Sequence, residues 1–77
     1  MSIDKLAIWT VYENPSDYPD MYVARLWEIG GRSAIAATGQ LMVEKRLFKL
    51  RQRLRKLGLF CMPRQDDDDP VIVETWM

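Results

Sequence analysis

The sequence predicts an α+β domain: a small, mainly antiparallel sheet of three to four strands in β-β-β-α-β order, with one amphipathic helix packed on one face. Three observations predict this class. Two stretches rich in β-branched and aromatic residues flank a loop of proline and aspartate residues. A leucine stripe at helical spacing follows them, and another β-branched stretch comes last.

The first two strands are expected at 6–13 and 22–29. The first ends at the breaker Asn14-Pro15, and both of its alternating faces are mostly apolar, which is typical of an interior strand covered on both sides. The segment 14–20 carries two prolines and two aspartates, which indicates a loop. The second strand is therefore expected to lie antiparallel to the first.

The segment Arg32 to Thr38 is open to two interpretations. Its alanine-rich run at 34–37 suits a helix by propensity. However, the pair Gly30-Gly31 before it is a hairpin signal, and Gly39 after it would weaken a continuous helix by about 1 kcal/mol. We therefore expect a short third strand rather than a helix.

A basic amphipathic helix is predicted from Leu41 to Leu57, or about 40–57, within a single domain that spans 1–77. Its apolar stripe has 4,3,4,3 spacing and consists of Val43, Leu47, Leu50, Leu54 and Leu57. Thr38 is the expected N-cap, and Gly58 stands where a glycine ends a helix. A short extended piece at 59–62, an acidic loop at 63–70 and a last strand at 71–76 are expected after it.

Composition excludes several classes of protein. The 77 residues allow one domain, and the 11 basic and 11 acidic residues balance, so nucleic-acid or membrane binding would have to rest on a local patch. One cysteine excludes an internal disulfide, and the lack of histidine argues against a zinc site, so no metal or other cofactor is expected. Packing or self-association must then supply the stability that disulfides and structural metal ions provide in other small domains.

Targeting signals are not evident. The first residues lack the basic and apolar regions of a secretory signal, and no apolar run approaches the ~20 residues that span a bilayer. A lone cysteine also suits a reducing compartment. We expect a cytoplasmic protein that does not enter a membrane.

Two blocks of the sequence carry a resemblance. The blocks are W-x-V-Y-x-x-P-x-D-Y-P at 9–19 and D-D-D-P-V-I-V-E-x-W at 67–76. With Tyr22-Val23-Ala24-Arg25, they resemble a group of short uncharacterised proteins of bacteria and their phages. The resemblance implies a bacterial or phage origin, and it implies no activity and no functional residues.

The residues of common catalytic sites are missing. Without histidine there is no Ser-His or Cys-His pair, and Gly30-Gly31 lacks the context of a phosphate-binding loop. Cys61, between Phe60 and Met62, is expected to be a small core hydrophobe, with a functional thiol as the alternative. Asp66 to Asp69 are expected to form a solvated loop, with a divalent-cation site as the alternative. We expect no enzyme activity.

Two surfaces remain as candidates for function. The basic helix face offers Lys45, Lys49, Arg53 and Lys56, which would contact phosphates in a salt-sensitive way or would simply be a solvated surface. One helix covers only one face of a sheet, so aromatic side chains on the other face, with Trp9 or Trp27 as anchors, would meet a second copy or a protein partner unless all three tryptophans are core. The sequence therefore favours a non-catalytic interaction or regulatory protein, with a nucleic-acid-binding module as the alternative.

Overall fold

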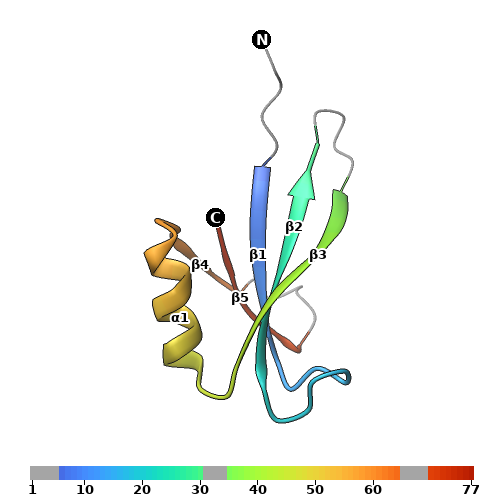
Figure 1. Ribbon diagram of the computed structural model, residues 1–77, viewed down its shortest axis with the longest axis vertical. Coiled ribbons are helices and arrows are strands. Elements are labelled where there is room, and N and C mark those ends of the chain that lie inside the picture. The colour runs from blue at the N-terminus through green and yellow to red at the C-terminus, as the bar shows by residue number, and fades with distance from the viewer. Residues whose placement is uncertain (1–5, 31–34, 65–69) are drawn as a thin grey trace.

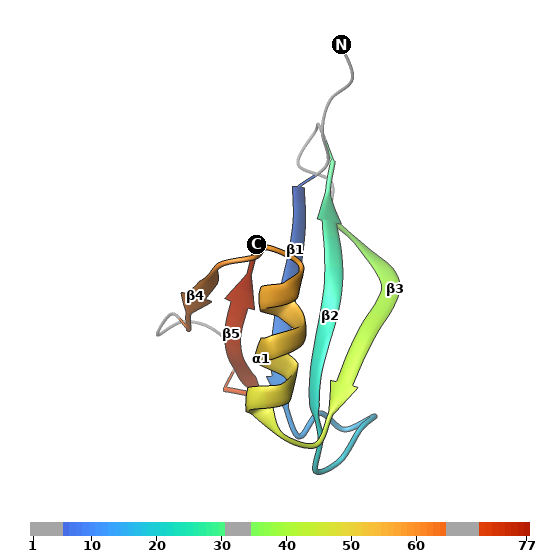
Figure 2. The same ribbon diagram turned by 60° about the vertical axis from the view of Figure 1, so that its left-hand side comes forward.

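The computed structural model describes residues 6–30, 35–64 and 70–77. Within them the elements are β1 (Leu6–Glu13), β2 (Tyr22–Ile29), β3 (Ile35–Glu44), α1 (Leu47–Lys56), β4 (Cys61–Pro63) and β5 (Ile72–Trp76). The strands form one antiparallel sheet in the order β3-β2-β1-β5-β4, and α1 lies against one of its faces (Figures 1 and 2). This confirms the α+β class, although the sheet has five strands rather than three to four.

The hairpin of β1 and β2 has the predicted bounds and the predicted antiparallel pairing, from Leu6 opposite Ile29 to Glu13 opposite Tyr22. Its loop is closed by side chains that suit tight turns. Asn14 adopts a positive φ of 52°, and its Oδ1 accepts a 2.8 Å hydrogen bond from the Asp20 backbone N–H. Asparagine and aspartate tolerate this backbone region better than most residues, because their short side chains bond to nearby backbone groups.

The third element is a strand, as predicted, but it is longer than expected. The part of the prediction at 32–34 falls on residues 31–34, which lie outside the described part of the chain. The strand continues through Leu41, Met42, Val43 and Glu44, which pair with Arg25, Ala24, Val23 and Tyr22 of β2. The predicted helix start at 40–41 is therefore wrong, because pairing with β2 satisfies these backbone groups in an extended conformation.

Thr38 and Val43 change roles as a result of this pairing. Val43 belongs to β3 and not to the helical stripe. Thr38, the expected N-cap, lies at an irregularity in β3, where its hydroxyl donates to the Leu26 carbonyl at 3.1 Å and accepts from the Gln40 backbone N–H at 3.1 Å. Gly39 lies between them with a positive φ of 83°, a conformation that glycine adopts without strain.

Helix α1 begins after Arg46, whose backbone is extended and whose side chain makes no capping hydrogen bond. Its other end matches the prediction. Basic side chains crowd the last turn, where they oppose the negative end of the helix dipole. Gly58 has a φ of 79°, and its N–H donates to the Arg55 carbonyl at 2.9 Å, which is how a glycine terminates a helix.

The core lies between α1 and the sheet face beneath it (Figure 2). Its buried cluster consists of Trp9, Val11, Ala24, Leu50, Leu54 and Trp76. Leu50 and Leu54 are fully buried and Leu47 packs against the cluster, so the middle of the predicted stripe is confirmed. Leu57 is 54% exposed, so the buried stripe ends at Leu54, one stripe position earlier than the spacing predicted.

The C-terminal half of the sheet surrounds β5, which lies between β1 and β4. Trp9 of β1 and Cys61 of β4 both lie opposite Trp76, which is 1% exposed. Cys61 itself is exposed, so the expectation that it belongs to the core is wrong: β4 is the sheet edge, where little packs over it. The acidic block at 66–69 lies outside the described residues, and no helix among the described residues has the length and hydrophobicity needed to cross a bilayer.

Candidate functional site

The sheet face opposite α1 carries a cluster of apolar side chains, which we call the open-face patch. Alternate residues of a strand point to opposite faces, so the patch draws its residues from the positions that the core does not use. The patch forms a shallow hollow lined by Ile8, Thr10, Tyr12, Trp27, Ile29, Ile35 and Ile72, which come from β1, β2, β3 and β5. Ile35 is 66% exposed there, and neighbouring Leu6 is 48% exposed.

The two tryptophans proposed as anchors lie on opposite faces. Trp9 is opposite Leu26 in the β1–β2 ladder and is 8% exposed in the core under α1. Trp27, the next residue after Leu26, points to the other face, where it lies opposite Ile8 and lines the open-face patch. Trp9 therefore has no surface for a partner, and the anchor role can rest only on Trp27.

One end of this face is covered by the β1–β2 loop. Arg25 makes an ion pair with Asp17 of that loop, and its guanidinium lies over the Tyr12 ring at 5.7 Å. The hydrogen bond from Arg25 lowers the pKa of Asp17. Val23, beside them, is fully buried. The charge on this end of the face is thereby neutralised within the chain.

The four candidate basic residues do not form one helical surface. Lys45 precedes α1, while Lys49, Arg53 and Lys56 lie on it, and all four are exposed. Arg53 pairs with Glu44 of β3 at 2.9 Å. The structure therefore leaves three lysines on this surface without an ion pair to any described residue.

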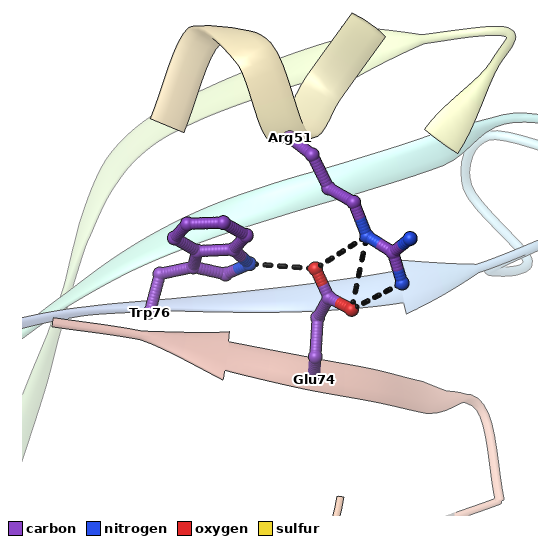
Figure 3. A network of polar contacts seen from close by, with 3 residues as sticks. All are labelled: Arg51, Glu74 and Trp76. Carbon is purple, nitrogen blue, oxygen red and sulfur yellow. Dashed lines mark hydrogen bonds and ion pairs between the residues drawn. The ribbon is translucent and has the colours of Figure 1, made fainter. Parts of the chain in front are cut away.

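A polar network that the sequence analysis missed joins α1 to β5 (Figure 3). Glu74 is 3% exposed and faces the helix. Its carboxylate accepts from Arg51 Nη2 at 2.7 Å, from Arg51 Nε at 3.1 and 3.2 Å, and from Trp76 Nε1 at 2.7 Å. The signal in the sequence was a single glutamate inside a β-branched strand, two residues before a tryptophan and hence on the same face.

The electrostatics of this network follow from its hydrogen bonds. Burial alone raises the pKa of Glu74, but the hydrogen bonds from Arg51 and Trp76 and the arginine charge together hold that pKa below its ordinary value. The same contact raises the pKa of Arg51. Both groups thus stay charged and mutually satisfied, which suits a structural link rather than a proton donor or acceptor.

Cys61 lies near this network beside a second hollow of about 390 Å³, which is lined by Arg55, Gly58, Leu59, Phe60, Cys61 and Trp76. The Arg55 guanidinium lies over the Trp76 ring at 5.8 Å. Although Cys61 is exposed as a residue, neighbouring protein atoms displace part of the water around its thiol, and this desolvation together with the Glu74 carboxylate raises the pKa of the Cys61 thiol. A raised pKa disfavours the thiolate, which is the reactive form.

Metal-ligating side chains do not gather within the described residues: no group of three or more cysteine, aspartate or glutamate side chains there could hold an ion. The alternative cation site at Asp66 to Asp69 falls outside those residues. Side chains with unsatisfied buried polar atoms are also absent from the described part of the chain. The open-face patch therefore remains the strongest candidate for a functional surface, because its apolar side chains are left partly exposed to water.

Comparisons with known proteins add no relative. No protein-family model matches the sequence, and no curated protein and no solved structure matches the chain. An account of function must therefore rest on the geometry of the surfaces described above.

Proposed function

We propose that this chain is a non-catalytic interaction protein that acts through protein–protein contacts made by the open-face patch. The observation that carries the proposal is the position of Trp27 among isoleucines on a sheet face that α1 does not cover. Contiguous apolar surface of this kind, bounded by polar residues, marks interaction sites on small proteins. Tryptophan is also one of the three residue types, with tyrosine and arginine, that are enriched among the residues that contribute most to binding.

The two edges of the sheet are less suitable interaction sites than its open face, because neither edge is suited to adding a strand from another molecule. At one edge, β4 has only three residues, and Pro63 has no N–H to donate. At the other edge, β3 is interrupted between Ala37 and Leu41, where three residues oppose Leu26 alone, and Figure 2 shows the strand bowing away from β2. Bulges and short edges are devices that discourage edge-to-edge pairing.

The substitution Trp27→Asp tests the proposal, because it places a charge in the patch without altering the core under α1. Association is measured by sedimentation velocity of the chain alone and by capture of partners from a bacterial lysate on the immobilised chain. Circular dichroism shows whether the fold is kept. We expect every association to weaken with Trp27→Asp and to survive the matched change Phe48→Asp, at an exposed phenylalanine of α1.

Two results would overturn this function. The first is a chain that stays monomeric and captures no protein. The second is an association that Trp27→Asp leaves unchanged while the variant keeps its fold. Either result would mean that the open-face patch is not the surface through which the chain acts.

The alternative, a nucleic-acid-binding module, has weaker support. Lys49 and Lys56 are exposed on α1 and Lys45 is exposed just before it, but Arg53 is engaged by Glu44 and Arg51 by Glu74. Three lysines would give weak, salt-sensitive contacts with phosphates. Fluorescence anisotropy with labelled DNA and RNA at low salt tests this, because binding through this surface must disappear when the three lysines are changed to glutamate.

A further inference from the structure

The first observation is that α1 covers one face of β1, whereas only the β1–β2 loop, at one end, covers the other. Its residues Trp9 and Val11 are buried under α1, whereas Ile8 and Tyr12 point to the open face and remain partly exposed. A strand with two apolar faces is typical of a sheet that is covered on both sides. Within one copy of this chain, the described residues cover only the end of the second face that lies beside the β1–β2 loop.

The second observation concerns charge. Among the described strand residues that point to the open face, Arg25 is the charged one, and its ion pair with Asp17 neutralises it. A face without net charge does not repel an identical face. It also offers no charged group by which a partner of complementary charge would be selected.

The third observation concerns size. Four neighbouring strands about 4.8 Å apart and about eight residues long, at about 3.3 Å per residue, present a flat projection of roughly 500 Å². The β1–β2 loop covers one end of each face, so two such faces in contact cover somewhat less than about 1,000 Å², which is the size of a weak, reversible interface rather than a tight one. The exposed Ile35 and Leu6 lie at the opposite end of the face and would gain the most burial.

We infer that the occupant of the open-face patch is a second copy of this chain, packed sheet against sheet around a twofold axis that passes near Trp27 and Ile8. This inference rests on the proposed function and names its partner. Aligned sheets pack about 10 Å apart with their strands rotated by about 30°. The dimer then has four layers, with the two sheets inside and one α1 helix on each outer surface.

In a twofold dimer the same surface is used by both copies, so one substitution removes contacts at two places in the interface and its effect on the free energy of binding is doubled. Truncating one tryptophan at the centre of an interface typically weakens binding by thirtyfold or more, so Trp27→Asp is expected to raise the dimer dissociation constant by roughly a thousandfold. Ile35→Asp is expected to raise it at least about tenfold. Because Ile35 is 66% exposed in a single copy, this second variant should fold even if Trp27→Asp does not.

Sedimentation equilibrium between about 1 and 500 μM tests the inference. The expected mass for the unaltered chain is twice its 9.0 kDa at the upper concentrations, falling toward 9.0 kDa on dilution. Trp27→Asp is expected to remain near 9.0 kDa throughout, and Ile35→Asp is expected to approach the dimer mass only at concentrations at least about tenfold higher than the unaltered chain needs. Phe48→Asp, a matched control on the outer surface of α1 where Phe48 is 54% exposed, should dimerise as the unaltered chain does.

Tryptophan emission provides a second measurement, because Trp9 and Trp76 are buried in the core while Trp27 is partly exposed in one copy. Dilution of the dimer should shift the emission to longer wavelength as Trp27 meets water. Trp27→Phe should dimerise while it loses that shift. Dimerisation of Trp27→Phe with the full shift retained would place the change at another tryptophan and overturn the inference.

The remaining outcomes separate this inference from the proposed function. A chain that is monomeric up to 500 μM but captures a different protein through Trp27 overturns the second copy and leaves the proposed function standing. A dimer that resists both Trp27→Asp and Ile35→Asp overturns both proposals. A dimer lost with Phe48→Asp and kept with the two patch variants places the interface on α1, and it also overturns both.

Discussion

The link between Arg51 and Glu74 makes the sharpest stability prediction. The change Arg51→Met keeps a long apolar stem on α1 but removes the guanidinium that donates to Glu74 at 2.7, 3.1 and 3.2 Å. The Glu74 side chain is only 4% exposed, so its carboxylate would remain in the protein interior with the Trp76 indole N–H as its hydrogen-bond donor. An incompletely paired charge in that position opposes folding.

The magnitude follows from how deeply each partner is buried. Removing one partner of a fully buried ion pair costs about 3–5 kcal/mol. The Arg51 side chain is 38% exposed, so solvent screens part of the attraction, and the bond from Trp76 persists. We therefore expect a loss of about 2–3 kcal/mol in the free energy of unfolding, which lowers the melting temperature by roughly 10–20 °C in a domain of this size.

The matched control is Arg53→Met on the same helix. Arg53 pairs with Glu44 at 2.9 Å, but the two side chains are 46% and 26% exposed. Exposed pairs contribute about 0–1 kcal/mol, so this variant should unfold within about 1 kcal/mol of the unaltered chain. Urea titration followed by circular dichroism, together with thermal melts, measures both variants under one condition.

The double variant Arg51→Met/Glu74→Gln isolates the charge itself. Replacing the carboxylate with a neutral amide removes the buried charge that Arg51→Met leaves behind, so part of the lost stability should return. Equal losses for Arg51→Met and Arg53→Met would refute the reasoning, because they would mean that the burial of Glu74 has no energetic consequence. A loss below about 1 kcal/mol for Arg51→Met would refute it as well.

Three further predictions concern pH, the helix end and the last strand. The folded-state pKa of Glu74 lies below its unfolded value near 4.5, so the stability that Glu74 contributes is present above that pH and is lost as pH falls through the folded pKa. The urea midpoint should therefore be lower at pH 3 than at pH 7, and Arg51→Met should reduce the difference between the two midpoints. Gly58→Ala should lower the free energy of unfolding by about 1–2 kcal/mol through backbone strain alone, since nothing lies within 4 Å of the added Cβ. A free energy of unfolding that stays within about 0.3 kcal/mol of the unaltered chain would contradict the strained conformation. Removal of residues 76–77 should abolish cooperative thermal unfolding, because Trp76 is 1% exposed against Trp9, and a sharp melting transition in the truncated chain would show that the core does not need it.

Local signals in the sequence were sufficient where no other part of the chain competes for the same residues. The bounds of β1 and β2 follow from breakers at their ends, such as Asn14-Pro15 and Gly30, and from β-branched and aromatic content between them. The end of α1 at Gly58 is equally local, because a positive φ after a helix is a property of the glycine itself. The Leu50 and Leu54 positions follow from helical periodicity and are the most deeply buried residues of α1.

The helix start could not be read in this way. The segment 41–44 fits a helix by its apolar spacing and a strand by its residues, and intrinsic propensities differ by only a few tenths of a kcal/mol per residue. Pairing between β3 and β2 makes this segment a strand, because Val43 lies opposite Val23 and Leu41 lies opposite Arg25 in the ladder. These partners are distant in sequence, so propensity and spacing within 41–44 do not reveal them.

The sequence by itself determined that this chain would be an α+β domain with one helix, and that this helix could cover only one face of the sheet. Only the tertiary structure decided which side chains lie on the other face. The β1–β2 register places Trp9 under α1 and Trp27 on the opposite side, and the order of strands brings Ile72 of β5 beside them. The physical reason is that a strand's faces alternate residue by residue, so a shift of one position in the ladder would exchange every core residue with every exposed one.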